Sequence, residues 1–179
     1  MLRHYNTALV LIDIQGKLAS LMHQREQLYR NLEILIKGAQ VLELPILWLE
    51  QYPQGLGPTI PEVAGLLKDQ QPLAKRCFSA CGLPEFGQAL RASGRRRVLL
   101  AGIEAHICVY QTCCDLLDQG YQVEVVADAV SSRTPENKKT GLDRMTQAGA
   151  VLTSVEMALF ELLRVAGTPQ FKEIARLVK

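Results

Sequence analysis

The sequence lacks a strong surplus of either charge and lacks any long apolar run. Its 179 residues include 20 Lys and Arg against 18 Asp and Glu, for a net charge of +2. This balance gives no electrostatic footprint for nucleic acid, and the one dense basic run, residues 95–97, is interpreted as the solvated start of a strand. The apolar runs are far shorter than the roughly 20 residues that span a bilayer. We therefore expect neither a nucleic-acid partner nor a membrane partner.

A paired cysteine pattern and a signal peptide are also missing. The five cysteines are odd in number, and their spacings suggest no set of disulfide bridges. The N-terminal residues show neither the long apolar segment nor the small-residue cleavage site of an export signal. We therefore expect reduced thiols and a cytoplasmic location.

Several motifs that define common functional classes are absent as well. Residues 12–18 contain a single glycine, so they do not form a glycine-rich phosphate loop. No stretch has the Cys and His spacing of a zinc site, and the G-x-S-x-G turn of serine hydrolases is missing. These absences exclude the dinucleotide-binding, zinc-finger and serine-hydrolase interpretations.

Apolar runs and helix-period segments alternate along the whole chain. Strands are expected at residues 7–14, 46–50, 73–75, 97–103, 123–130 and 150–154, and helices at 24–43, 84–92, 107–119 and 135–148, with two more around Pro169. Because the strands are apolar throughout, both of their faces are expected to be buried, as in a parallel sheet covered by helices. The pattern predicts one α/β domain over residues 1–179, with three layers (α/β/α) and about six parallel strands.

Ligands in such sheets bind beyond the carboxyl ends of the strands. Polar residues follow four of the expected strands there: Asp13 with Gln15, residues 50–59, Lys75, and residues 104–108. A buried carboxylate costs several kcal/mol unless it is paired. Alone, Asp13 is equally well explained as a carboxylate that caps a loop, and Lys75 as a surface charge. Because both follow strands that share one edge, each is a candidate partner for the other.

Cys108 is the candidate nucleophile. It lies in the first turn of an expected helix, where free backbone N–H groups and the helix dipole favour a thiolate. Such a thiolate should be alkylated faster than the other four cysteines at neutral pH, whereas a buried packing role predicts the opposite. His106 is a poor base for Cys108, because side chains two residues apart on a helix do not face each other. Asp13 is the better-placed base, with Lys75 as the orienting group.

These residues resemble those of the isochorismatase-like cysteine hydrolases, which include nicotinamidases and N-carbamoylsarcosine amidase. The resemblance rests on D-x-Q at Asp13 and Gln15, on Lys75, and on the G-I-x-x-x-x-C turn that ends at Cys108. It covers nearly the whole chain. The strings EQYPQGLGPT, PLAKRCFS, GIEAHIC, DAVSSR and PQFKEI are similar to the isochorismatase domain-containing subgroup, which largely lacks assigned substrates.

The resemblance implies a six-stranded sheet in the order 3-2-1-4-5-6. It also implies a triad in which Asp13 deprotonates Cys108 and Lys75 keeps the carboxylate ionised. A non-proline cis peptide is implied between Ile103 and Glu104, with the N–H groups of Glu104 and Cys108 forming an oxyanion hole. The implied reaction is hydrolysis of a small amide or ureido C–N bond through a thioester.

Two departures from relatives narrow this expectation. Nicotinamidases bind a metal through an Asp and two His after the second strand, but this chain has no histidine between His23 and His106. We therefore predict no metal and no cofactor. Isochorismatases proper lack the nucleophilic cysteine and cleave a vinyl ether, so Cys108 argues against that reaction.

The substrate-binding candidates are Gln15, Glu50, Tyr52 and Arg133, although each is equally compatible with a contact that fixes a loop. The expected partners are a small-molecule substrate and further copies of the chain, because relatives are commonly dimers or larger. Two alternatives remain open. One is a catalytically silent protein that acts as an oligomeric binding or regulatory partner. The other is a thiol redox sensor with Cys113–Cys114 or Cys77–Cys81 as the reactive pair.

Overall fold

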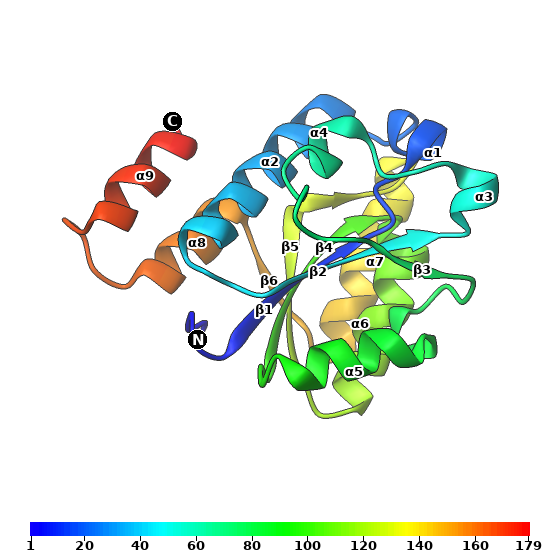
Figure 1. Ribbon diagram of the computed structural model, residues 1–179. Coiled ribbons are helices and arrows are strands. Elements are labelled where there is room, and N and C mark those ends of the chain that lie inside the picture. The colour runs from blue at the N-terminus through cyan, green and yellow to red at the C-terminus, as the bar shows by residue number, and fades with distance from the viewer.

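The computed structural model describes residues 1–179 and contains one parallel sheet of six strands (Figure 1). The strand order β3-β2-β1-β4-β5-β6 confirms the order 3-2-1-4-5-6. The strands are β1 (Thr7–Ile12), β2 (Ile46–Gln51), β3 (Leu73–Lys75), β4 (Arg97–Ile103), β5 (Gln122–Ser131) and β6 (Val151–Thr153). The chain therefore reverses its direction of strand addition between β1 and β4, which is where α/β sheets bind ligands.

The central strands are buried because both faces of the sheet are covered. Every residue of β1 is buried, and its side chains alternate between two cores. Leu9 and Leu11 pack in one core, whereas Ala8, Val10 and Ile12 pack in the other. This arrangement explains why the strand sequences show no alternation of apolar and polar residues.

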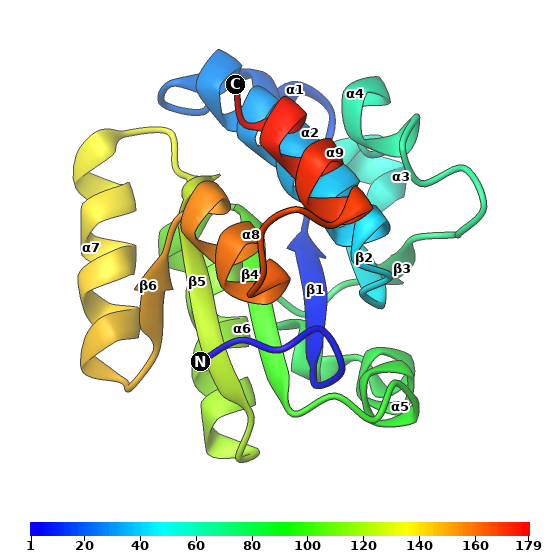
Figure 2. The same cartoon turned by 90° about the vertical axis from the view of Figure 1, so that its left-hand side faces the viewer.

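Helices cover the two faces in separate layers. One layer holds α2 (Arg25–Val41), α8 (Val155–Leu163) and α9 (Pro169–Leu177), and Figure 2 shows α9 lying over α2. The opposite layer holds α5 (Pro84–Ala92), α6 (Tyr110–Asp118) and α7 (Pro135–Gln147). The three predicted layers are therefore confirmed. None of the helices combines the length and the apolar character needed to cross a membrane.

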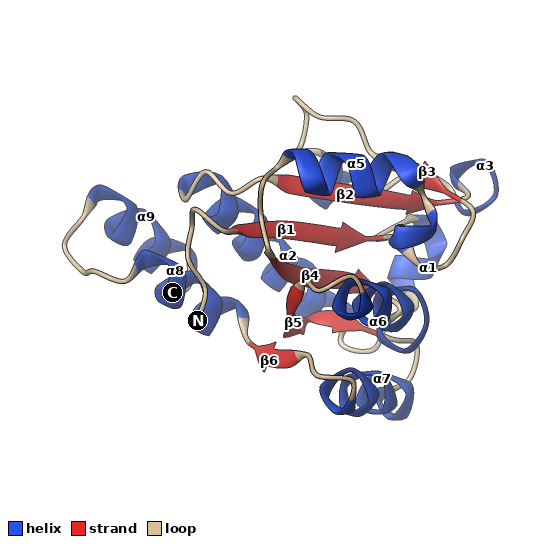
Figure 3. Ribbon diagram, turned by 90° about the horizontal axis from the view of Figure 1, so that it is seen from below, coloured by secondary structure: helices blue, strands red, loops and turns tan.

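Short helical segments fill the connections near the carboxyl edge of the sheet. They are α1 (Gly16–Ser20), α3 (Pro53–Leu56), α4 (Pro61–Ala64) and a 3₁₀ turn, η1 (Ala80–Gly82). In Figure 3 the arrowheads of β1 and β2 lead toward α1 and α3. The helix expected at residues 107–119 instead starts as a π-helical turn, η2 (Ala105–Val109), which continues into α6.

A glycine brings β4 close to β1 at this edge. Gly102 pairs with Ile12 and has a φ of +117°, a conformation that side chains disfavour. A Cβ atom added to Gly102 would lie only 2.1 Å from the Ile12 carbonyl oxygen. The close approach places the residue after β1, Asp13, beside the turn that carries Cys108.

Candidate active site

Asp13 and Lys75 form a buried ion pair at the carboxyl edge of the sheet. Asp13 directly follows β1, and its N–H donates to the Leu49 carbonyl of β2 (3.2 Å). Lys75 ends β3, two strands away, and its Nζ lies 2.7 Å from Asp13 Oδ2. The side chains of Asp13 and Lys75 are 2% and 0% exposed. The sequence placed both residues at one edge of the sheet, and the structure joins them as charge partners.

Three other oxygens hold the Lys75 ammonium in place. Its Nζ donates to Gln51 Oε1 (2.6 Å), to the Phe78 carbonyl (2.9 Å) and, at a longer 3.3 Å, to the Cys77 carbonyl. An ammonium group has three N–H donors, so the shorter contacts and Asp13 account for all of them. Gln51 was missed in the sequence; its position at the end of β2, between Glu50 and Tyr52, was the available signal.

The two carboxylate oxygens of Asp13 have different surroundings. Oδ2 accepts from Lys75, whereas Oδ1 is buried and makes no hydrogen bond. Burial raises the pKa of the Asp13 carboxyl above its ordinary value of 3.8, and the Lys75 ammonium opposes this shift. The Cys108 thiol also opposes this rise in the pKa of Asp13. Asp13 therefore has one anchored oxygen and one oxygen free to accept a proton.

Cys108 lies on the η2 turn, where it is 8% exposed. Burial raises the pKa of its thiol to about 12, and the negative charge of Asp13 adds to the shift while Lys75 opposes it. The position of Cys108 near a helix start was compatible with a thiolate or with a buried packing role, and the raised pKa keeps the thiol protonated at neutral pH in this state. Desolvation outweighs the dipole because the sulfur is buried beside a carboxylate. A thiol in this state can attack only if a base takes its proton, and the Asp13 carboxylate is close enough to act on it.

The peptide bond between Ile103 and Glu104 is cis. The Glu104 Oε2 accepts from the backbone N–H (3.0 Å) and the Nε–H (3.2 Å) of Arg133. The η2 turn is held from outside by α7: a Cβ added to Gly141 would lie 2.7 Å from the backbone of Ala105. These contacts fix the backbone between β4 and Cys108.

Gln15 and Glu50, two substrate-binding candidates, are used to fix loops. Gln15 donates to the carbonyls of Gln51 (3.1 Å) and Gly57 (2.6 Å) and accepts from the Gln51 N–H (2.5 Å). Glu50 accepts from the N–H (2.6 Å) and the hydroxyl (2.7 Å) of Thr59. Both side chains are buried, and their hydrogen bonds are made with residues of β2 and of the loop that follows it. In this state they hold that loop in place.

Tyr52 and Arg133 remain available to solvent. The Tyr52 residue is 43% exposed, and its ring lies 5.0 Å from the Arg76 guanidinium carbon. The Arg133 side chain is 54% exposed while its Nε contacts Glu104. Phe78, whose carbonyl binds Lys75, is 55% exposed. Two aromatic rings and a guanidinium group in the segments next to Lys75 and Glu104 are therefore exposed.

The His106 imidazole contacts Ser132 rather than Cys108. Its Nδ1 lies 2.9 Å from the Ser132 hydroxyl, so the imidazole is tied to the segment that follows β5. No group of three or more His, Cys, Asp or Glu side chains is arranged to hold a metal ion. The chemistry that the arrangement offers is that of a thiol, a carboxylate and an ammonium group.

The fold and this edge of the sheet define the chain as a three-layer α/β protein with a buried Asp–Lys–Cys cluster. An Isochorismatase domain matches residues 7–157. Isochorismatase domain-containing protein 2 from Homo sapiens is 43% identical over 175 residues, which cover 97% of this chain and 83% of that protein. The chain belongs to the isochorismatase-like hydrolase family.

Solved structures show the same fold. A structure of a MAR1 ribonuclease from Caenorhabditis elegans has a TM-score of 0.93 at 38% identity, covering 99% of this chain and 91% of that one. The YcaC gene product of Escherichia coli, described as an octameric hydrolase of unknown specificity, has a TM-score of 0.92 at 25% identity, covering 98% and 89%. The names of these relatives agree on hydrolysis but not on a substrate.

Proposed function

We propose that the protein is a cysteine-dependent hydrolase that cleaves a small amide or ureido C–N bond through a thioester. The observation that carries this proposal is the unpaired, buried Asp13 Oδ1 beside the Cys108 thiol, with Lys75 fixed on the other oxygen. A nucleophile, an adjacent base and an orienting group are the parts that covalent catalysis requires.

The first half of the reaction forms the thioester. Cys108 Sγ attacks the carbonyl carbon while Asp13 Oδ1 takes the thiol proton, so that the thiolate forms only as it reacts. The carbonyl oxygen becomes an oxyanion that accepts from the backbone N–H groups of Glu104 and Cys108. Protonated Asp13 then gives its proton to the leaving nitrogen, the C–N bond breaks, and ammonia or an amine departs.

The second half regenerates the enzyme. Asp13, again ionised, takes a proton from a water molecule as the water oxygen attacks the thioester carbon. The C–S bond breaks, the proton returns to the Cys108 sulfur, and a carboxylic or carbamic acid leaves. Lys75 keeps Asp13 oriented in both halves of the reaction, because its Nζ is held by Asp13, Gln51 and Phe78 oxygens.

The surroundings favour an uncharged or lightly charged substrate. Tyr52 and Phe78 present aromatic surface, and Arg133 is the exposed cation near the η2 turn. The Asp13 carboxylate is neutralised by Lys75, so the cluster adds little net charge of its own. We propose a compact amide whose reacting carbonyl reaches a largely neutral site.

We also propose that the protein is a homo-oligomer and that it is located in the cytoplasm. The octameric state given for the E. coli YcaC structure supports a homo-oligomer for this chain, which sedimentation of the purified protein tests. A monomer at micromolar concentration would contradict it. The absence of disulfide bonds among the five cysteines is consistent with the proposed cytoplasmic location.

Ammonia release from a panel of small amides and ureido compounds tests the function. Wild type, Cys108→Ala and Cys114→Ala are compared, with one arm containing EDTA. Cys114 is a matched control, since it lies on α6 outside the Asp–Lys–Cys cluster. The proposal predicts release by wild type and Cys114→Ala, none by Cys108→Ala, and no effect of EDTA. Ammonia release by Cys108→Ala would contradict the proposal.

RNA cleavage is the second candidate, because the nematode relative is named a ribonuclease. An oligoribonucleotide belongs in the same assay. Cleavage by wild type that survives in Cys108→Ala, without turnover of any amide, would favour this candidate. Inactivity toward every compound, combined with normal folding, would favour the catalytically silent binding protein.

A further inference from the structure

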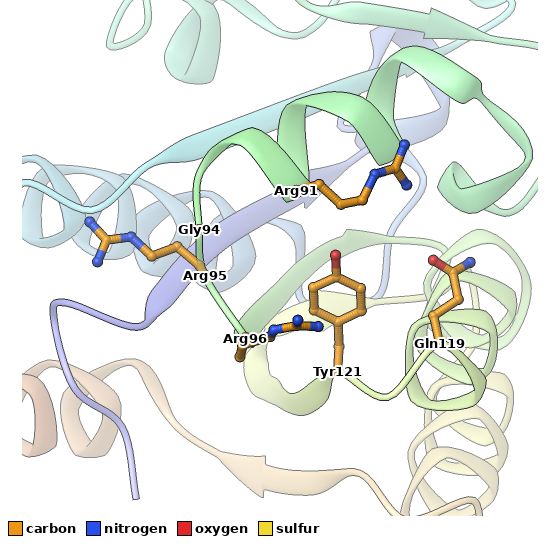
Figure 4. Close-up of a pocket in the computed structure, with 6 residues that line it drawn as sticks. All are labelled: Arg91, Gly94, Arg95, Arg96, Gln119 and Tyr121. Atoms are coloured by element: carbon orange, nitrogen blue, oxygen red, sulfur yellow. The ribbon is translucent and has the colours of Figure 1, made fainter.

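A cavity of about 420 Å³ lies at the opposite end of the sheet from Cys108 (Figure 4). It is lined by Arg91, Gly94, Arg95, Arg96, Gln119 and Tyr121. The strand β4 separates the two ends: it starts at Arg97 and runs six residue steps to Ile103, or roughly 20 Å. The cavity is therefore distinct from the candidate active site.

The three consecutive arginines at residues 95–97 have different environments. Arg97 pairs with Glu124 (3.3 Å) on β5, and Arg95 donates to the Tyr5 carbonyl. Figure 4 shows Arg95 directed away from Tyr121, whereas Arg96 lies beside the Tyr121 ring. Arg96 is therefore the member of the run whose guanidinium group lies beside Tyr121, another residue that lines the cavity.

The cavity carries positive charge without a carboxylate partner. Neither Arg91 nor Arg96 takes part in any of the ion pairs of the chain. The helices α5 and α6 both end at the cavity, and each contributes roughly half a negative charge. Three lining guanidinium groups, of Arg91, Arg95 and Arg96, against about one negative charge leave a positive surplus, which favours an anion.

The remaining lining groups are neutral hydrogen-bonding groups. The Tyr121 residue is 8% exposed, and its hydroxyl makes no hydrogen bond with another residue but points toward α5 in Figure 4. Gln119 adds an amide at the end of α6. These groups suit the hydroxyl oxygens of an organic ligand, and the volume lies in the range of small-molecule pockets rather than that of a free phosphate.

We propose that this cavity binds a phosphomonoester that carries hydroxyl groups, such as a sugar phosphate. The Arg91 guanidinium group lies over Gly87 on α5 in the unliganded chain, and we propose that this exposed side chain turns toward Arg96 so that both planar forks contact the phosphate. Tyr121 and Gln119 bind the hydroxyl-bearing part. A small ligand fits better than a nucleic acid, since the positive groups gather in one hollow and the chain's net charge is only +2.

Isothermal titration of the full chain with ribose 5-phosphate tests the proposal. Inorganic phosphate, ribose and a single-stranded oligoribonucleotide are the comparison ligands. We expect saturable binding of ribose 5-phosphate, weaker binding of phosphate and none of ribose. Absence of ribose 5-phosphate binding, equal affinity for free phosphate, or tighter binding of the oligoribonucleotide would each overturn the assignment.

Variants locate the binding. Arg91→Gln with Arg96→Gln should weaken ribose 5-phosphate binding by about 100-fold, or roughly tenfold for each charge-assisted contact. The exposed Arg30 on α2 forms no ion pair, so Arg30→Gln is the matched control and should bind like wild type. Arg91→Lys with Arg96→Lys keeps the charge but loses the forks, and should bind with intermediate affinity. Thermal melting checks that each variant is folded. Unchanged binding by the double Gln variant contradicts the proposed site.

Discussion

Lys75 Nζ contacts only one oxygen of Asp13, Oδ2 at 2.7 Å, and leaves Oδ1 without a hydrogen bond. In the proposed mechanism this asymmetry lets one carboxylate perform two tasks. The oxygen bound to Lys75 keeps the carboxylate oriented, and the other oxygen is available for the proton of the Cys108 thiol. The account of the site follows from this division.

The first prediction concerns Asp13→Asn. The variant should lose hydrolysis, because no base remains, yet its Cys108 thiol should become more acidic. Burial raises the pKa of Cys108 to about 12 in the wild type and the charge of Asp13 adds to that shift, while Lys75 opposes it and stays in the variant. The measurement is the pH dependence of iodoacetamide labelling at Cys108. An unchanged or higher thiol pKa in Asp13→Asn would show that the carboxylate does not act on the sulfur.

The second prediction concerns pH. Burial raises the pKa of Asp13 above 3.8, and Asp13 must be ionised to act as the base. As the pH falls through this raised pKa, the base becomes protonated and kcat/KM should decline, with the acid limb at a higher pH than for a free carboxyl group. A pH–rate profile with any amide that is turned over tests this. Full activity down to pH 3.8 would contradict it.

The raised pKa of the Cys108 thiol also predicts how fast this cysteine is alkylated. Because burial raises the pKa of the Cys108 thiol to about 12, unliganded Cys108 should be labelled at neutral pH more slowly than N-acetylcysteine. Rapid labelling at neutral pH would indicate a standing thiolate, and the concerted role of Asp13 would then be wrong.

The third prediction concerns Lys75→Met. Removing one partner of a buried ion pair leaves an uncompensated charge, so we expect the free energy of unfolding to fall by about 3–5 kcal/mol. Without the ammonium group the Asp13 pKa rises further. The folded state then keeps a proton on Asp13 that the unfolded chain releases above about pH 3.9. The stability of the variant should therefore decline as the pH rises from about 3.9 toward the raised pKa of Asp13 in the folded state.

Urea denaturation measures this effect. Lys139→Met is the matched control, because Lys139 and Asp143 form an exposed ion pair on α7, and its loss should change stability by no more than about 0.5 kcal/mol. Adding Asp13→Asn to Lys75→Met should restore part of the lost stability. A further loss of the same size in the double variant would mean that the two side chains are not partners.

Much of the fold was predictable because local signals agree with the tertiary structure. Residues 97–103 and 84–92 form β4 and α5 with the predicted bounds: the first run is apolar after Arg97, and the second starts at Pro84 and is followed by Gly94. The strand order was implied by the family resemblance. The meeting of Asp13 with Lys75 follows from the rule that parallel strands end at one edge.

Other features depend on contacts that sequence patterns do not show. Gln51 contacts Lys75, and Gln15 and Glu50 are taken up by loops, only because the segment after β2 folds back onto β1. The thiol pKa of Cys108 depends on how deeply the sulfur is buried, which its position near a helix start did not reveal. The substrate, the single-domain organisation and the cytoplasmic location stay predictions.

The fourth prediction concerns Gly102→Ala. The added Cβ would lie 2.1 Å from the Ile12 carbonyl oxygen in a backbone conformation with φ of +117°. We expect a loss of about 3 kcal/mol or more in stability, together with loss of activity, because Asp13 and the η2 turn move apart. Gly94→Ala is the control: its φ is also positive, but no atom lies within 4 Å, so it should cost only about 1 kcal/mol. Thermal melting measures the stability of both variants. Equal losses of stability in the two would contradict the close packing of β1 on β4.

Trapping the acyl-enzyme tests the central claim most directly. The wild type, Cys108→Ala and Cys114→Ala are incubated briefly with p-nitrophenyl acetate, quenched in acid and analysed by peptide mass spectrometry. The account predicts one acetyl group on the peptide that contains Cys108, removable by neutral hydroxylamine as a thioester, in the wild type and in Cys114→Ala only. Acetylation that persists in the same peptide of Cys108→Ala, or its absence from Cys108 in an active wild type, would contradict the account.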